Sequence, residues 1–122
     1  MMRYFCLLSV FALVGFTSCL KEKTIEPIIV EPGPCSDTVS FTNFIMPEII
    51  DASCNTMGCH DQTGSGGYIL INHNQVSTNA NVIYSAISHE AGFTPMPLGQ
   101  NKISDTLIQK FDCWIQQGTL NN

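Results

Sequence analysis

Two thiols and an imidazole stand close together in the run CNTMGCH, at Cys54, Cys59 and His60. Thiols add covalently to vinyl groups, and a histidine placed directly after them can bind iron through a ring nitrogen. This order of side chains attaches haem to protein, because the thiols take its two vinyl groups and the histidine is held under the iron. The run therefore predicts a covalent haem site.

Two other interpretations of the same run remain open. Cys54 and Cys59 could close a small disulfide loop with His60 on the surface, or bind zinc together with His60 and one of His73 or His89. Zinc requires thiolates, whereas an exported protein usually has its free thiols oxidised or modified. We therefore favour haem.

The beginning of the chain predicts export. Arg3 precedes an apolar stretch over residues 4–16, which is too short to cross a bilayer and fits the hydrophobic region of a secretory signal. The following FTSC resembles a bacterial lipobox, in which Cys19 would carry the lipid and become the first mature residue. The alternative is an ordinary secretory signal with an incidental Cys19. Residues 1–18 are thus interpreted as a signal peptide, and the mature protein is expected on a membrane of the bacterial cell envelope, facing the periplasm or the outer surface.

Behind the anchor, residues 19–34 are expected to form a tether and residues 35–122 a single folded domain. Pro27, Pro32 and Pro34 lack backbone donors and favour an extended, solvated tether. The domain has two basic and seven acidic side chains. This balance argues against nucleic acid as a partner, and against binding to an anionic membrane by charge.

The apolar pattern of the domain predicts a mostly helical fold. Helical spacing runs over residues 41–50, where Pro47 is acceptable if it lies in the first turn. A short helix is expected to open at Asn79 or Asn81. Residues 68–71 form the one segment with a strand-like alternation.

The last helix is the clearest element. Ser104 is placed to cap its first free N–H groups, Asp105 complements the positive end of its dipole, and Gly118 ends it in a left-handed conformation. Between them runs an apolar stripe at helical spacing, which comprises Leu107, Ile108, Phe111, Trp114 and Ile115. So few apolar residues make a marginal core, so something else is expected to fill the middle of the domain.

Three features in this order resemble a c-type cytochrome: the CNTMGCH run, the loop FTPMPLG around Met96, and a final amphipathic helix. The resemblance covers about residues 41–118 and is closest to the cytochrome c-like domains of bacterial lipoproteins. The spacer between Cys54 and Cys59 has four residues where the usual motif has two. The resemblance implies a few helices wrapped round one haem that is bound covalently to both cysteines.

It also implies two axial ligands for the iron. His60 would be the proximal ligand, and Met96, held between two prolines that stiffen its loop, the distal ligand. His73 or His89 would replace Met96 if the iron had two histidine ligands. A dry apolar shell is expected from Phe93, Leu107, Phe111 and Trp114.

Cys35 and Cys113 are the mature cysteines left once haem takes Cys54 and Cys59 and a lipid takes Cys19. A disulfide between them would join the start of the domain to its last helix. Closing so long a loop would stabilise the fold by about 4.5 kcal/mol in the chain-entropy model. The alternative is two unpaired thiols, which an oxidising compartment disfavours.

The resemblance implies an electron carrier rather than an enzyme, and redox proteins as its partners. Because the surface of the domain is acidic, we expect those partners to have a basic docking patch. Two other classes stay open. In a haem sensor or enzyme, Met96 would be displaced by peroxide or a gas, although no arginine follows Arg3 to serve a peroxidase. In a haem-free, disulfide-stapled binding module on the cell surface, His60 and Met96 would be replaceable without loss.

Overall fold

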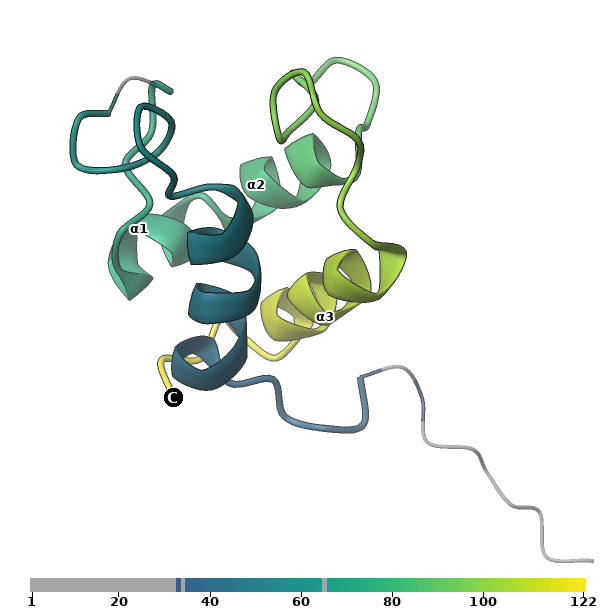
Figure 1. Ribbon diagram of the computed structural model, residues 1–122. Coiled ribbons are helices and arrows are strands. Elements are labelled where there is room, and N and C mark those ends of the chain that lie inside the picture. The colour runs from purple at the N-terminus through teal and green to yellow at the C-terminus, as the bar shows by residue number, and fades with distance from the viewer. Residues whose placement is uncertain (1–32, 34, 65) are drawn as a thin grey trace, which may run out of the picture. The chain divides into compact units, whose positions relative to one another are not determined.

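Helices build the described part of the chain, which comprises residues 33, 35–64 and 66–122 of this computed structural model (Figure 1). Within these residues lie η1 (Phe41–Asp51), α1 (His73–Thr78), α2 (Ala80–Ile87) and α3 (Asp105–Gln116), and no strand. The prediction of a mostly helical domain is confirmed. The strand-like alternation over residues 68–71 is part of a loop instead.

The expected signal peptide (residues 1–18), the lipidated Cys19 and the tether (residues 19–34), except for Gly33, lie outside the described residues. Of the helices that the structure does describe, none has the length and apolar character needed to cross a membrane. The domain that follows is therefore described by itself.

α3 has the ends that the sequence predicts. The side chain of Ser104 accepts a hydrogen bond from the N–H of Leu107 at 3.3 Å, and Asp105 lies in the first turn. Beyond the helix, Gly118 has a φ of +88°, a left-handed conformation that glycine adopts without steric cost. The predicted apolar stripe packs inward, since Ile108, Phe111 and Trp114 are buried.

η1 begins after Ser40, whose side chain accepts a hydrogen bond from the N–H of Asn43 at 3.1 Å. The helix is wound as a π-helix, in which each N–H reaches the carbonyl five residues earlier, as the N–H of Ile45 does with Ser40 at 3.0 Å. Pro47 lies well inside η1 and so does not meet the condition, a place in the first turn, under which the sequence makes it acceptable. A proline inside an α-helix removes one hydrogen bond and clashes with the carbonyl four residues earlier, and here the winding around it is not α-helical.

α1 and α2 follow one another with one residue, Asn79, between them. Asn72 caps α1 by accepting a hydrogen bond from the N–H of Gln75 at 3.1 Å. Asn79 stands at the cap position of α2, which confirms one of the two predicted starts. The sequence pattern does not predict α1, because this helix has six residues and buries Val76 alone.

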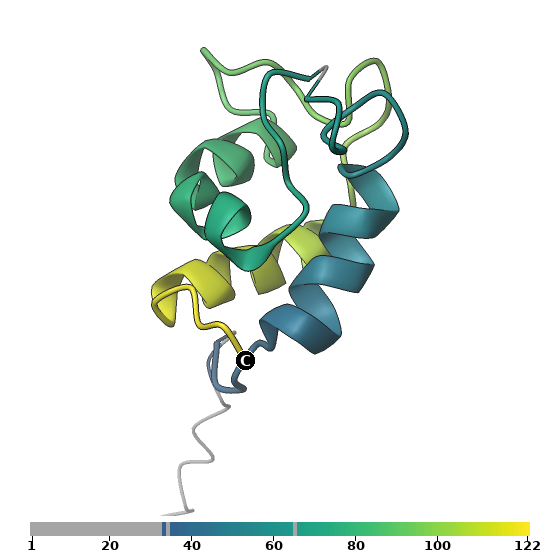
Figure 2. The same ribbon diagram turned by 90° about the vertical axis from the view of Figure 1, so that its left-hand side faces the viewer.

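α3 packs against both η1 and α2, and α1 contacts α2. Figure 2 shows η1 and α3 alongside one another. The Trp114 ring centre lies 5.6 Å from that of Phe41 in η1 and 5.5 Å from that of Phe111, within the range of aromatic contact. Other fully buried side chains of this core are Ile45, Ile49, Ile50, Val76, Ile87 and Cys113. The aromatic face of α3 is therefore used in the contact between helices.

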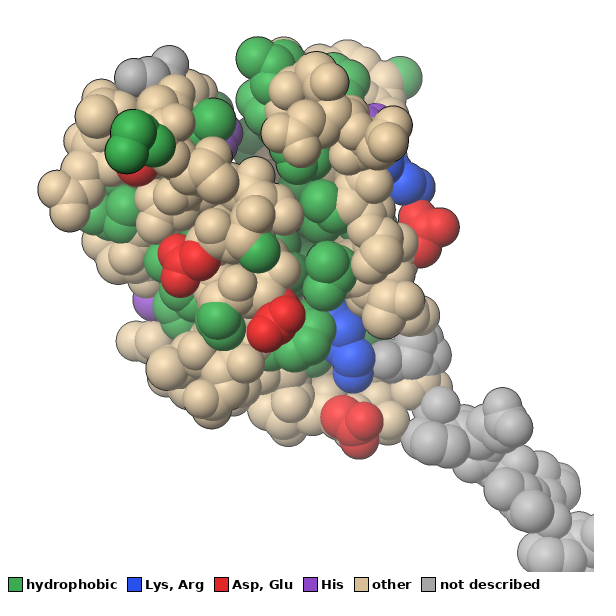
Figure 3. Space-filling model, in the orientation of Figure 1, with side chains coloured by type: hydrophobic (Ala, Val, Ile, Leu, Met, Phe, Trp, Pro, Cys, Tyr) green, Lys and Arg blue, Asp and Glu red, His purple; other side chains and the backbone are tan. Residues whose placement is uncertain are grey.

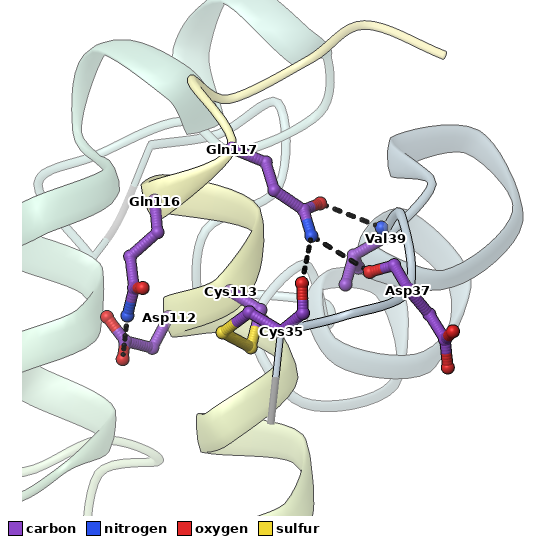
Figure 4. The surroundings of a disulfide bond; sticks show 7 residues. All are labelled: Cys35, Asp37, Val39, Asp112, Cys113, Gln116 and Gln117. Carbon is purple, nitrogen blue, oxygen red and sulfur yellow. Dashed lines mark hydrogen bonds between the residues drawn. A yellow bond between two sulfur atoms is a disulfide. The ribbon is translucent and has the colours of Figure 1, made fainter. Parts of the chain in front are cut away.

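A disulfide bond joins Cys35 to Cys113 and fixes the start of the domain to α3 (Figure 4). Gln117, just beyond α3, adds hydrogen bonds to the same segment. Its Oε1 accepts from the N–H of Val39 at 2.9 Å, and its Nε2 donates to the carbonyls of Asp37 at 2.8 Å and Cys35 at 3.4 Å. The two ends of the domain are thereby tied together.

Two long connections extend beyond the helices on the same side in Figures 1 and 2. The attachment loop (residues 52–64 and 66–72) links η1 to α1, and the methionine loop (residues 88–104) links α2 to α3. Both loops carry residues that the sequence singles out for chemistry.

Candidate functional site

A cavity of about 870 Å³ lies among the attachment loop, α2 and the methionine loop. Its size falls within the roughly 300–1,000 Å³ that is typical of ligand pockets. The space-filling view in Figure 3 shows the surface hollowed at one end of the domain. Cys54, Cys59, His60 and Met96 all contribute to its wall. The described residues that line the cavity include no Asp, Glu, Lys or Arg, so its wall carries no fixed charge.

Cys54 lies three residues beyond the end of η1, and its N–H donates to the carbonyl of Ile50 at 2.8 Å. Its thiol is buried and donates to the carbonyl of Ile49 at 3.6 Å. Burial, together with the neighbouring Cys59 thiol, raises the pKa of the Cys54 thiol from 9.0 to about 11. Cys59 is exposed, and the two cysteines are free thiols in the structure rather than a disulfide.

His60 is buried, and the backbone on both sides of it is held. Its N–H donates to the carbonyl of Cys54 at 3.1 Å, and its own carbonyl accepts from the N–H of Leu70 at 2.9 Å. The ring atom Nδ1 lies 3.0 Å from the carbonyl oxygen of Tyr68. A carbonyl can only accept, so Nδ1 carries the proton and Nε2 has the free lone pair that a metal requires.

Gly66 lies against this imidazole. A Cβ atom at this position would come within 2.7 Å of His60 Cε1 and 2.8 Å of Nδ1, closer than real Cβ contacts. The N–H of Gly66 also donates to the carbonyl of Cys59 at 2.8 Å. A residue without a side chain therefore lets the attachment loop close over the ring.

Asp61 fixes the turn around the two functional residues before it. Its carboxylate accepts hydrogen bonds from the N–H of Gly58 and the N–H of Thr63, each at 3.0 Å, and from the Thr63 hydroxyl. The hydroxyl of Thr63, followed by the two N–H groups, lowers the pKa of Asp61 below its ordinary value. The ionised side chain thus connects the backbone on either side of Cys59 and His60.

Met96 enters the cavity wall from the methionine loop and is partly buried against the core. Its N–H donates to the carbonyl of Ala86 in α2 at 3.0 Å, and its carbonyl accepts from Nε2 of His89 at 3.0 Å. The backbone of Met96 is therefore attached to the end of α2 through both of its polar groups.

His73 and His89, the predicted alternatives to Met96, are not among the residues that line the cavity. His73 donates from Nε2 to the carbonyl of Thr119 at 2.8 Å and packs edge-on against Phe41, with ring centres 4.9 Å apart. The bond from His89 Nε2 to the carbonyl of Met96 occupies one of the two ring nitrogens of His89.

Of the four residues expected to form an apolar shell, one lies at the cavity and three lie elsewhere. Phe93 lines the cavity, whereas Leu107, Phe111 and Trp114 do not. Trp114 packs against Phe41 of η1 and against Phe111, and both α3 rings are fully buried in the core. The apolar wall comes from α2 and the methionine loop, through Val82, Ile83, Ile87, Leu98 and Ile103.

The zinc interpretation has no geometric support in the described part of the chain. No group of three or more His, Cys, Asp or Glu side chains there is arranged to hold a metal ion. This result does not bear on an axial pair of His60 and Met96, because that pair has only two ligands, one nitrogen and one thioether sulfur.

Sequence reasoning misses three contributors to the site: the Tyr68 carbonyl, Gly66 and Asp61. Asp61 and Thr63 stand two apart, a spacing typical of a side chain that bonds backbone two residues ahead. The glycines near residue 66 signal a close backbone approach. Nothing in the sequence marks the carbonyl of Tyr68, since every residue has one.

No protein-family model matches the chain, and neither a curated protein nor a solved structure matches it significantly. The function therefore has to be argued from the geometry of the cavity.

Proposed function

We propose that this chain is an exported, lipid-anchored c-type cytochrome with one haem, and that it carries electrons rather than acting as an enzyme. In this proposal Cys54 and Cys59 hold the haem covalently, and His60 and Met96 are the axial ligands of its iron. Cys19 carries the lipid, and the partners are other redox proteins of the cell envelope.

One observation carries the proposal: a single cavity is lined by two free thiols, a histidine and a methionine. The His60 Nδ1 bond to Tyr68 leaves Nε2 as the ring atom available for iron. Ligating histidines in metal sites almost always donate their other ring nitrogen in this way, which fixes the tautomer and the ring orientation. The donor set and the size of the cavity thus fit haem.

Haem, when bound, would supply one-electron chemistry through its iron. The chain tunes that chemistry through its own groups. A thioether from Met96 favours the ferrous state and raises the reduction potential. The apolar wall, which includes the buried Ile83 and Ile87, excludes water and raises the potential further.

The test is expression with a cytochrome c assembly system, followed by a haem stain on a denaturing gel and an optical spectrum. Haem that survives denaturation is expected in the parent protein. The parent spectrum should be absent from the double variant Cys54→Ala/Cys59→Ala and from the single variant His60→Ala. The ferric thioether band is expected to vanish in Met96→Ala. Met57→Ala is the matched control, since this side chain is 96% exposed and lies between the two cysteines.

Each of the rival functions has its own result in the same experiment. Bound haem that is five-coordinate and high-spin would point to a sensor or enzyme with an open distal site. Absence of bound haem from correctly exported protein would overturn the proposal and leave a disulfide-stapled binding module. Covalent haem without the thioether band would keep the cytochrome and remove Met96 as ligand.

The anchor is tested separately from the haem. Labelled fatty acid should be incorporated into the parent chain and lost in Cys19→Ala, while Cys6→Ala, inside the expected signal peptide, should label normally. Protein that fractionates with membranes without the label would contradict the lipid anchor.

A further inference from the structure

The backbone of Met96 is fixed at two points, both at the end of α2. Its N–H donates to Ala86 at 3.0 Å, and its carbonyl accepts from Nε2 of His89 at 3.0 Å. Because a carbonyl has no proton to give, the imidazole must be the donor. The Ala86 contact is made by backbone alone, whereas the His89 contact depends on a particular side chain.

His89 occupies a position where glycine is usually preferred. The N–H of Glu90 bonds to Ser85 at 3.0 Å and the N–H of His89 to Ala86 at 3.2 Å, the paired bonds that close many helix C-termini. The residue in this position has a left-handed backbone, and His89 has a φ of +58°. Side chains other than glycine are disfavoured there by steric contact, so the chain carries a strained residue at this helix end.

The contact made by the His89 side chain gives a reason for a residue other than glycine at this left-handed position. The left-handed turn directs the chain out of α2, and the imidazole reaches the carbonyl seven residues further along. A glycine would close α2 with less strain and leave that carbonyl unheld. His89 therefore serves the methionine loop rather than the helix.

We propose that His89 is a positioning residue for Met96, and that its imidazole holds the thioether ready at the cavity wall. The proposal rests on the proposed function, since it takes Met96 as the distal ligand. A prearranged ligand loses less conformational freedom on binding, so an outside ligand competes with it less well. His89 thus acts on the iron through Met96 and is not itself a ligand.

The test compares His89→Gly with His89→Gln. Glycine suits the left-handed backbone but lacks the donor, whereas the glutamine amide nitrogen can reach about as far as Nε2. The measurement is the affinity of the ferric protein for added imidazole, which must displace Met96. We expect imidazole to bind about fivefold more tightly to His89→Gly, as loss of one hydrogen bond predicts, and close to the parent affinity in His89→Gln.

A purely structural role predicts a different pattern. Closing α2 with glycine would leave the melting temperature unchanged or raised, and imidazole affinity would stay at the parent value in His89→Gly, which would overturn the proposal. His73→Gln is the matched control, because His73 also donates to a backbone carbonyl, that of Thr119, but away from the cavity. It should leave imidazole affinity unchanged.

A second measurement separates this proposal from the haem assignment. In protein without haem, the amide proton of Met96 should exchange with solvent about fivefold faster in His89→Gly, because the loop that presents it is held by one bond fewer. If the parent chain binds no haem but shows this effect, the proposed function fails while the positioning by His89 stands. Equal exchange in both proteins would overturn the positioning itself.

Discussion

The Nδ1 atom of His60 lies 3.0 Å from the carbonyl oxygen of Tyr68, eight residues further along the chain. The intervening loop passes so close to the imidazole that a Cβ atom on Gly66 would lie 2.7 Å from Cε1 of His60. The ring orientation is therefore set by backbone atoms, and this bond leaves Nε2 as the second ring nitrogen of a residue that lines the cavity. The consequences of this arrangement can be measured directly.

Replacement of Gly66 by alanine should displace the His60 ring. The added Cβ would lie 2.7 Å from Cε1, and Gly66 has an ordinary negative or extended φ, so that the effect is steric alone. We expect the free energy of unfolding, measured in urea, to fall by about 1–3 kcal/mol, as for other overpacked sites. Gly33→Ala is the control, because nothing lies within 4 Å of its added Cβ. Equal stability of the two variants would contradict the contact.

The haem-free chain should lose stability in alkaline solution through Cys54. Its pKa is raised to about 11 in the folded protein from 9.0, so the unfolded chain releases this proton first. The contribution is fully present below pH 9.0 and is lost as the pH rises through about 11. Two pKa units correspond to about 2–3 kcal/mol.

To check this role of Cys54, the unfolding free energy is measured at pH 8 and pH 11 for the parent chain and for Cys54→Ala, and the loss between the two pH values is compared. The variant should show the smaller loss, because the remaining groups titrate alike in both proteins. Cys59→Ala keeps the buried Cys54 thiol and removes only the smaller cause of its raised pKa, so its loss should lie closer to that of the parent than to that of Cys54→Ala. A loss of the same size in Cys54→Ala would show that another group is responsible.

Removal of the disulfide should destabilise the whole domain. Cys35 and Cys113 are 78 residues apart, and a loop of this length confers up to about 4.5 kcal/mol in the chain-entropy model. We expect Cys35→Ser with Cys113→Ser to unfold at lower urea by that amount or less. Reducing agent should lower the stability of the parent and leave the double variant unchanged, and a parent insensitive to reduction would contradict the bond's role.

In the proposed cytochrome, electron exchange with small charged probes should depend only weakly on salt. The chain has a formal net charge of −5, yet the described residues that line the cavity carry no Asp, Glu, Lys or Arg. We expect the oxidation rates by an anionic hexacyanoferrate and a cationic metal ammine each to change by less than about twofold between low and physiological salt.

A charge introduced at the rim should restore the salt dependence. Leu98 is 71% exposed and lines the cavity, whereas Leu120 is 43% exposed and does not line it. Leu98→Glu should make the rate with the anionic probe rise with salt, and Leu120→Glu should have little effect. Strong salt dependence in the parent protein would show that the net charge, not the cavity wall, governs approach.

The sequence predicts those elements whose signals are local. α3 is found with its cap at Ser104 and its end before Gly118, because capping side chains and a 3.6-residue stripe can be recognised without knowing the fold. α1 escapes prediction because tertiary contact, rather than an apolar stripe, supports six mostly polar residues. The apolar spacing of residues 41–50 indicates a helix there, but it does not encode the π-helical winding that surrounds Pro47.

In the candidate site, too, the sequence predicts what depends on residue type and misses what depends on the fold. The candidate ligands Cys54, Cys59, His60 and Met96 can be identified from the sequence because their chemistry lies in the side chain, which the residue type specifies. The Tyr68 carbonyl that holds His60 is a backbone atom, and only the path of the loop brings it close. The aromatic residues Phe111 and Trp114 suit a cofactor shell and a helix contact equally well, and the packing of α3 on η1 decides between them.

The covalent bond at Cys35, with the hydrogen bonds of Gln117 beside it, also determines how the domain bears mechanical load. A pull on the chain ahead of Cys35 passes through the sulfur atoms into α3 before it can reach η1. Cys54 and His60, which follow η1, are thus shielded from that force.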